Sequence, residues 1–132
     1  MYTVLLADDS ASVRTLACSV LRGAGYAVLA VEDGSQALAL ARAYPGSIDL
    51  LVTDISMPRM SGIALRRAFS EFRPATPVLL ISGNPGNTIT GAQFLPKPFT
   101  PGQLRSAVAA LLATAQPAAV GASGAATDQS RV

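Results

Sequence analysis

Short apolar runs alternate along this chain with stretches in which apolar residues recur at every third or fourth position. The apolar runs lie at residues 2–7, 27–31, 48–54, 77–81 and 93–95. Near-continuous runs of this length are typical of strands covered on both faces of a parallel sheet. The periodic stretches lie at residues 13–24, 34–44, 62–72 and 104–112, and they predict amphipathic helices. The alternation predicts an α/β fold with one doubly wound, five-stranded parallel sheet in strand order 2-1-3-4-5.

Capping residues mark where the predicted helices begin and end. Thr100 precedes Pro101 and is followed three positions later by Gln103, a combination that starts a helix. Within the first and third helices, the spacing places Leu16 and Phe72 on the faces expected to pack against the sheet.

Two stretches interrupt the alternation. Only the ten residues 83–92 separate the fourth strand from the fifth, and they include three glycines, a proline and two threonines. Because a helical crossover needs about 10 to 12 residues, the helix expected there is predicted to be missing or reduced to a turn. From Pro117 onward the chain is rich in Ala, Gly, Ser and Thr. We therefore expect one domain over residues 1–116 and a disordered tail over 117–132.

Composition excludes several classes of function. Half of the 132 residues are hydrophobic, which suits one domain with a substantial core, yet no run is long enough for a membrane span or an export signal. The net charge of +2 comes from scattered basic residues, so neither nucleic acid nor a membrane surface is expected as a partner. The single cysteine, Cys18, fits a buried thiol in a reducing compartment, and a cytoplasmic location is expected.

Histidine and lysine counts are more specific. The chain has no histidine, which excludes histidine-based catalysis, histidine metal ligation and service as a phosphohistidine donor. Lys97 is the only lysine beside nine arginines, which indicates a specific role for that side chain.

Polar residues at the ends of four predicted strands form a candidate site. Asp8 and Asp9 end the first strand, Asp54 the third, Ser82 the fourth and Lys97 the fifth. Since open α/β sheets bind ligands at the carboxyl ends of their strands, these side chains should meet at one edge. Three carboxylates that converge repel one another and raise a pKa unless a cation neutralises them. Oxygen ligands without His or Cys favour Mg²⁺, for which Mn²⁺ can substitute, with room left for a phosphoryl group.

Each of these residues also has an ordinary structural reading. Asp8 and Asp9 could cap the first helix, and Asp54 could be a turn aspartate. Ser82 could be a loop residue before a glycine, and Lys97 a solvated lysine between prolines. The combination at the strand ends is what favours a functional site.

In sequence, these residues resemble the receiver domain of bacterial two-component response regulators, from Thr3 to about Ala115. The resemblance is carried by five motifs, namely Leu-Leu-Ala-Asp-Asp-Ser, Glu-Asp-Gly at 32–34, Asp54-x-x-Met-Pro-x-Met-x-Gly, Leu-Leu-Ile-Ser-Gly and Phe-Leu-Pro-Lys-Pro-Phe. It implies a flavodoxin-like fold. It also implies that Asp54 is phosphorylated and that Asp8 and Asp9 hold Mg²⁺ with it, aided by the backbone carbonyl of Ser56.

The same resemblance assigns roles on the other side of the site. Ser82 looks like the hydroxyl that bonds a phosphoryl oxygen, Lys97 like the basic partner of the phosphate and Phe94 like the switch aromatic. The Lys97–Pro98 peptide resembles the family's cis bond. A histidine kinase or histidine phosphotransfer protein would supply the phosphoryl group, and the phosphorylated chain would switch binding to a downstream protein, with a homodimer as one form.

Two other classes share parts of this pattern. A Mg²⁺-dependent phosphatase with an aspartyl-phosphate intermediate would want a second acid two residues after Asp54, where this chain has Ser56. A receiver-like adaptor that works without phosphorylation would not need all the site residues. A nucleotide-binding module is disfavoured because Asp8-Asp9-Ser10 matches no glycine-rich phosphate loop. The resemblance implies a signalling phosphoacceptor rather than an enzyme. Because Met1 lies just before the first strand, a stand-alone receiver is expected rather than an excised piece of a hybrid kinase.

Overall fold

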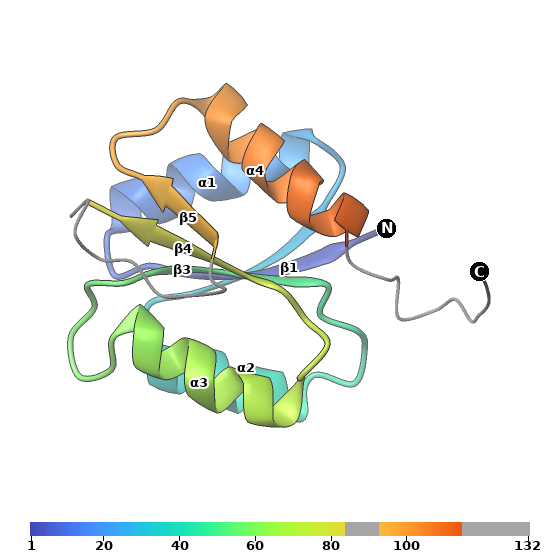
Figure 1. The fold of residues 1–132 in the computed structure, drawn as a ribbon, viewed down its shortest axis with the longest axis vertical. Coiled ribbons are helices and arrows are strands. Elements are labelled where there is room, and N and C mark those ends of the chain that lie inside the picture. Colours follow the sequence, from blue (N-terminus) through green and yellow to red (C-terminus); the bar gives the residue numbers. More distant parts are fainter. Residues whose placement is uncertain (84–92, 115–132) are drawn as a thin grey trace.

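Residues 1–83 and 93–114 are described by a computed structural model, in which helices cover both faces of a parallel sheet (Figure 1). The elements are β1 (Thr3–Ala7), α1 (Ala11–Gly23), β2 (Ala27–Val31), α2 (Gly34–Ala43), β3 (Leu50–Asp54), α3 (Gly62–Phe72), β4 (Val78–Ser82), β5 (Gln93–Pro96) and α4 (Pro101–Thr114). All four strand pairs are parallel, and the strand order is β2-β1-β3-β4-β5. The predicted fold class is confirmed.

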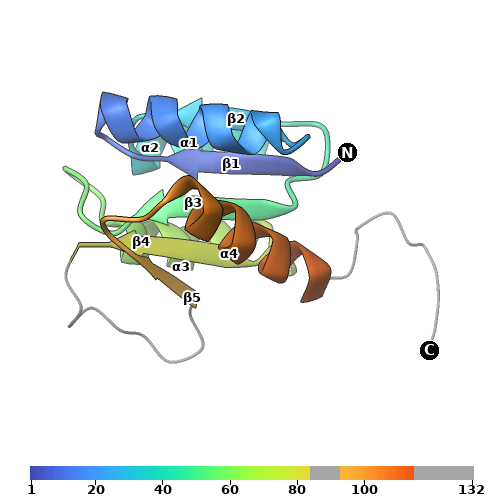
Figure 2. The same cartoon turned by 90° about the horizontal axis from the view of Figure 1, so that it is seen from above.

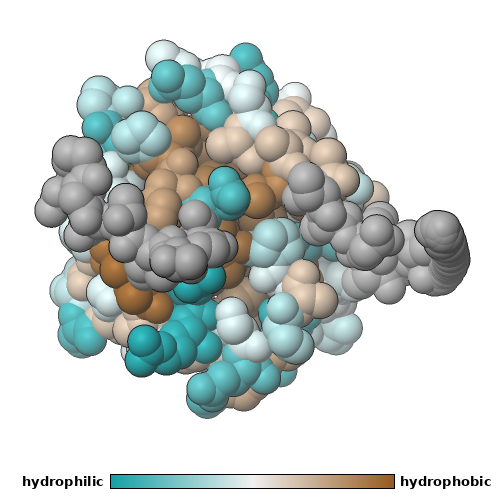
Figure 3. Space-filling view, viewed as in Figure 1, coloured by the Kyte–Doolittle hydropathy of each residue, from teal (hydrophilic) through white to brown (hydrophobic). Residues whose placement is uncertain are grey.

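Each face of the sheet has its own core. Helices α1 and α4 lie side by side on one face, and α2 and α3 lie together on the other (Figure 2). Every residue of β3 and β4 is buried, and alternate residues of each strand contribute to the two cores. In the orientation of Figure 1, apolar side chains also gather at the surface between α4 and α3 (Figure 3). The double covering explains why these strands read as continuous apolar runs.

Side chains cap the N-terminal ends of the four helices α1, α2, α3 and α4. Ser10 and Ser61 accept hydrogen bonds from the third residue after each, and Asp33 accepts one from the N–H of Gln36. Ahead of α4, the Thr100 hydroxyl accepts from the Gln103 N–H at 3.1 Å while the Gln103 side chain accepts from the Thr100 N–H at 2.8 Å. This reciprocal pair is the predicted capping box.

Arg73 joins the ends of two helices on the side of the sheet away from the strands' carboxyl ends. Its guanidinium donates to the carbonyls of Ala41, Tyr44 and Gly46 over distances of 3.0–3.2 Å. These carbonyls lie at the C-terminal end of α2, where the helix leaves its last acceptors without internal partners. One side chain therefore caps α2 from the residue that follows α3.

Two expected core residues are exposed instead. Leu16 is 43% exposed because α1 packs through Ala17, Cys18 and Leu21, a stripe too narrow to include its neighbour. Phe72 is the last residue of α3 and is 45% exposed, with the guanidinium carbon of Arg42 4.8 Å from the ring centroid. Helix periodicity predicted the right faces but not the width of each.

Some predictions concern residues outside the described ranges. The reduced helix was predicted for residues 83–92, of which only Gly83 is described, and the tail at 117–132 lies beyond residue 114. Both remain predictions. Within the ranges that are described, no helix combines the length and the apolar character needed to cross a membrane.

Candidate functional site

Three carboxylates meet at the carboxyl edge of the sheet, where β1 and β3 lie side by side. Asp8 follows β1 and is fully buried, Asp54 ends β3 and is 5% exposed, and Asp9 is exposed. Each offers an oxygen, and the three oxygens lie within 4.8 Å of one another. Asp8, Asp9 and Asp54 are called the acidic cluster below.

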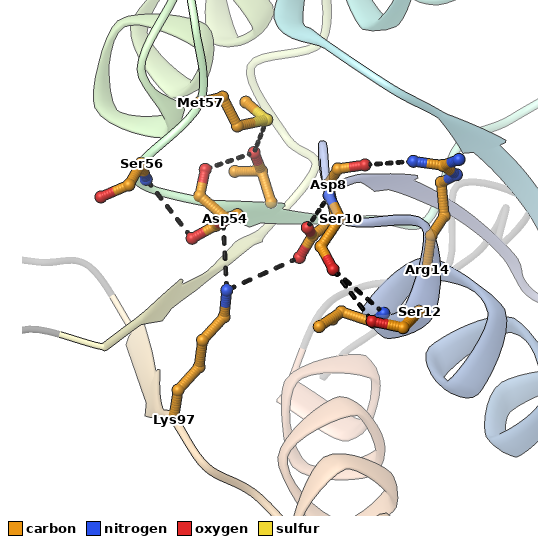
Figure 4. A network of polar contacts seen from close by, with 10 residues as sticks. Asp8, Ser10, Ser12, Arg14, Asp54, Ser56, Met57 and Lys97 are labelled. Atoms are coloured by element: carbon orange, nitrogen blue, oxygen red, sulfur yellow. Dashed lines mark hydrogen bonds and ion pairs between the residues drawn. The ribbon is translucent and has the colours of Figure 1, made fainter.

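Asp8 is held by its neighbours along the chain. Its Oδ1 accepts a hydrogen bond from the Ser10 N–H at 2.8 Å, and its main-chain oxygen accepts one from Arg14 Nη1 at 2.7 Å (Figure 4). Its Oδ2 is buried without a hydrogen-bond partner among the described residues. Burial raises the pKa of Asp8, the nearby charge of Asp54 raises it further, and the Ser10 N–H opposes both.

Lys97 reaches into the acidic cluster from the end of β5. Its Nζ donates to Asp54 Oδ2 at 3.1 Å and lies 3.9 Å from Asp8 Oδ2 (Figure 4). The Lys97 side chain is 27% exposed. The second oxygen of Asp54 accepts from the Ser56 N–H at 3.3 Å. The structure therefore places the single lysine against two carboxylates of the acidic cluster.

The loop after Asp54 packs tightly against it. The Gly62 N–H donates to the Ile55 carbonyl at 2.8 Å, and a Cβ on Gly62 would collide with the backbone carbonyl of Asp54. Arg59 has a φ of 68° and donates to Asp33 Oδ2 at 3.0 Å. The Gln36 N–H, and after it Arg59, lowers the pKa of Asp33. The loop is therefore fixed at Gly62 and tied to the start of α2.

The acidic cluster suits a hard divalent cation. It offers carboxylate oxygens and no nitrogen or sulfur, and Asp8 contributes a buried oxygen that lacks a donor. Mg²⁺ prefers such ligands and keeps several waters, which an exposed Asp9 allows. The residues present fit the ion that the sequence predicted.

Other predicted site residues lie near the same edge. Ser82 is buried at the end of β4, and its carbonyl accepts from the Lys97 N–H at 2.8 Å. Ser56 is exposed just beyond β3. Phe94 lies within β5, partly buried against the core on the α2 and α3 side. The Lys97–Pro98 peptide is cis, as predicted.

Two residues that support the site were not predicted to do so. Ser10 holds the Asp8 carboxylate and Arg14 holds its carbonyl. The sequence carried a signal for Ser10, since a serine just before a predicted helix is a typical N-cap. The backbone N–H of such a residue can donate to the carboxylate two positions earlier, as it does here to Asp8. No sequence signal distinguishes Arg14 from the other scattered arginines.

The sequence of this chain matches a known protein family. The family model of the response regulator receiver domain matches residues 4–109. This chain therefore belongs to the receiver-domain family of two-component signalling systems.

Known relatives include both small and large proteins. The response regulator receiver protein CpdR of Brucella abortus is 36% identical over 106 residues, which are 75% of this chain and 87% of that protein. The sensor kinase CckA of the same species is 33% identical over 119 residues, or 83% of this chain and 12% of the kinase. The transcriptional regulatory protein CpxR of Escherichia coli is 33% identical, over 85% of this chain and 50% of the regulator. The chain thus spans half or less of CckA and CpxR.

Solved structures give the same result. The crystal structure of the receiver domain of the hybrid histidine kinase CckA has a TM-score of 0.75 and 37% identity, covering 83% of this chain and 98% of that one. The chemotaxis response regulator CheY4 of Vibrio cholerae has a TM-score of 0.75 and 31% identity, covering 84% and 98%. These structures support the fold and the family together.

Proposed function

We propose that Asp54 accepts a phosphoryl group from a phosphohistidine of a histidine kinase or a histidine phosphotransfer protein. The observation that carries this proposal is the contact of Lys97 Nζ with Asp54 Oδ2 at 3.1 Å, beside two further carboxylates at the sheet edge. This arrangement combines a carboxylate nucleophile with a cation at the position where phosphoryl charge would arrive.

The reaction forms one bond and breaks one. A carboxylate oxygen of Asp54 attacks phosphorus in line with the P–N bond of the phosphohistidine, and that bond breaks as the new P–O bond forms. The imidazole leaves with the electron pair and takes up a proton at that nitrogen. Asp54 becomes an acyl phosphate. The chain acts as a signalling phosphoacceptor that assists only its own phosphorylation and dephosphorylation.

Each neighbouring residue has a distinct part in this proposal. Asp8, Asp9 and Asp54, with the Ser56 carbonyl, would hold Mg²⁺ or Mn²⁺, which supplies charge neutralisation to the phosphoryl oxygens. Lys97 moves from the Asp54 carboxylate to a phosphoryl oxygen, an exchange of one anionic partner for another.

Phosphorylation then acts as a switch. The added negative charge draws the Ser82 hydroxyl toward the phosphoryl group, and Phe94 turns into the space that this motion leaves. The burial of Ser82 at the end of β4 and the packing of Phe94 in the adjacent strand support a coupled movement. A downstream protein, or a second copy of this chain, would bind the switched form. The free, buried Cys18 fits the reducing conditions of the bacterial cytoplasm.

Intact mass measurement tests the proposal. Acetyl phosphate with Mg²⁺ should add one phosphate to the wild-type chain, and Asp54→Asn should add none, because an amide does not attack phosphorus. Asp49→Asn is the matched control, since it changes the same residue type just before the same strand. A mutant at Asp54 that gains phosphate at the wild-type rate would refute the assignment. Rapid hydrolysis of added phosphoesters would instead indicate a phosphatase. Absence of any phosphorylated form of the wild-type chain would indicate an adaptor that works without phosphorylation.

A further inference from the structure

A cavity lies outside the acidic cluster, between α1 and the edge strand β2. It is a cavity of about 360 Å³ lined by Arg14, Thr15, Cys18, Ser19, Arg22 and Ala30. Its volume falls within the range of small-molecule sites, about 300 to 1,000 Å³. These six residues are called the arginine groove below.

Helix geometry arranges the lining in two rows. Arg14, Cys18 and Arg22 are spaced by four residues and form one row along α1, and Thr15 and Ser19 form the adjacent row. The two arginines start about 12 Å apart along the helix axis, at 1.5 Å per residue. The groove therefore has a cation at each end, with hydroxyl groups and a small apolar floor between them.

Both arginines are fixed in place by backbone carbonyls. Arg14 Nη1 donates to the Asp8 carbonyl at 2.7 Å, and Arg22 Nη2 donates to the Val28 carbonyl at 3.1 Å. Each guanidinium has five N–H donors, so most of them are left for other partners. Anchoring reduces the conformational entropy that a ligand would otherwise have to overcome.

Neither charge is paired with a carboxylate of the residues that the structure describes. Among the described residues, the ion pairs involve Arg59 and Lys97 only, and no residue lining the groove is acidic. Two other arginines have their charge or their donors satisfied within the protein. Arg59 pairs with Asp33, and the guanidinium of Arg73 donates to three carbonyls. The arginine groove thus combines anchored guanidinium groups with unused donors and unbalanced charge.

We propose that the arginine groove binds a small organic molecule that carries phosphoryl groups at two ends, of the class of a nucleoside bisphosphate. A guanidinium at each end matches two phosphoryl groups, since planar forks of N–H donors bind phosphate oxygens in pairs. The Thr15 and Ser19 hydroxyls suit a sugar-like body between them. Inorganic phosphate alone would engage one end and bind more weakly.

Two-dimensional NMR titration tests this without Mg²⁺ or a phosphodonor, so its result is independent of phosphorylation at Asp54. Adenosine 3′,5′-bisphosphate is the probe, and inorganic phosphate and a glutamate-rich peptide are the comparisons. We expect saturable shifts confined to residues 14–22 and 28–31, and affinity for the bisphosphate above that for both comparisons.

Three variants locate the site. Arg22→Gln should weaken bisphosphate binding about tenfold or more by removing a charge-assisted contact. Ser19→Asp, an exposed helix position that leaves both arginines in place, should abolish binding by adding a negative charge. Arg67→Gln removes an exposed arginine on α3 and should leave affinity unchanged.

Several results would overturn the proposal. Shifts centred on Asp54 and Lys97 would place the anion at the acidic edge instead. Tighter binding of the glutamate-rich peptide would make the groove a protein-docking surface. Absence of saturable shifts, or equal affinity in Ser19→Asp and wild type, would exclude the site.

Discussion

Asp8 and Lys97 face each other at the carboxyl edge of the sheet and are held there by different means. Asp8 is fixed by the main chain, through the Ser10 N–H on its carboxylate and Arg14 on its carbonyl. Lys97 follows a four-residue edge strand, and among the described residues its ammonium pairs with the carboxylates of Asp8 and Asp54. The acidic side is set by the fold, whereas the position of the lysine depends on the charges opposite it. A change of charge at Asp54 should therefore move the lysine and leave the acids in place.

Asp8→Asn should produce the largest effect on the acidic side. We expect Mg²⁺ affinity to fall about 100-fold. Mutation of a residue that only supports a metal ligand costs up to about 100-fold in affinity, and Asp8 would itself be a ligand. The metal-free protein should become more stable, with an unfolding midpoint about 4 °C higher, since a buried charge whose Oδ2 accepts no hydrogen bond is removed. Titration calorimetry and thermal unfolding measure the two quantities. Unchanged Mg²⁺ affinity would show that Asp8 only caps α1.

Lys97→Met should change both Mg²⁺ affinity and the stability of the metal-free protein in the opposite direction. Removing a positive charge that lies 3.1 Å from Asp54 Oδ2 and 3.9 Å from Asp8 Oδ2 should raise Mg²⁺ affinity at least about fivefold, since two unit charges about 4 Å apart interact by about 1 kcal/mol even in bulk water. It should lower the stability of the metal-free protein by leaving the acids unneutralised. The same two measurements apply, with Arg67→Met as a control for loss of surface charge. Weaker Mg²⁺ binding in Lys97→Met would contradict the view that lysine and metal compete for these oxygens.

Gly62→Ala tests whether the loop helps to fix the acidic side. The added methyl would collide with the Asp54 carbonyl, so the backbone must shift, and we expect a loss of about 2 kcal/mol in unfolding free energy. Gly23→Ala, at the end of α1, meets open space and should be neutral or slightly stabilising. Urea unfolding compares the two. Equal stability of both variants would show that Asp54 does not depend on this packing.

Arg59→Ala should have the smallest effect. The pair with Asp33 is at the surface, where ion pairs contribute little, and Arg59 is only a secondary cause of the low pKa of Asp33. A lowered pKa adds stability that is present above the ordinary value of 3.8 and is lost as pH falls through the folded-state pKa. This acid-range loss should persist in Arg59→Ala and disappear in Asp33→Ala. Thermal unfolding between pH 2 and 6, a range set by about two units around that value, distinguishes them.

Much of the fold could be predicted because its signals are local. Apolar runs, caps and the Thr100–Gln103 capping box act within a few residues of one another, and the strands and helices begin close to where they predict. Leu16 and Phe72 could not be placed, because their exposure depends on how each helix sits on the sheet. That is a property of the packed molecule and not of the periodicity.

The sequence predicted which residues meet at the sheet edge, but not how differently each of them is buried. Asp8 and Asp9 are identical neighbours, and only the structure shows that one is fully buried and the other exposed. The scattered spacing of the arginines indicates solvated surface. Two of them have further contacts, because Arg14 donates to the carbonyl of Asp8 and Arg22 lines a cavity. Their spacing of eight residues on one helix was visible, but the carbonyls that anchor them come from other parts of the chain.

The contacts of Arg73 bear on how freely this sequence can drift. An exposed arginine such as Arg67 can be exchanged for many residues at little cost. At position 73, lysine is not an equivalent replacement, because a single ammonium does not reproduce a planar fork that reaches three separate carbonyls. Loss of the Arg73 guanidinium would leave the carbonyls at the end of α2 without these donors. A substitution at position 73 would therefore be tolerated only after a substitution at 44 or 46 had capped the helix in another way. The order in which substitutions can accumulate in this region is therefore restricted.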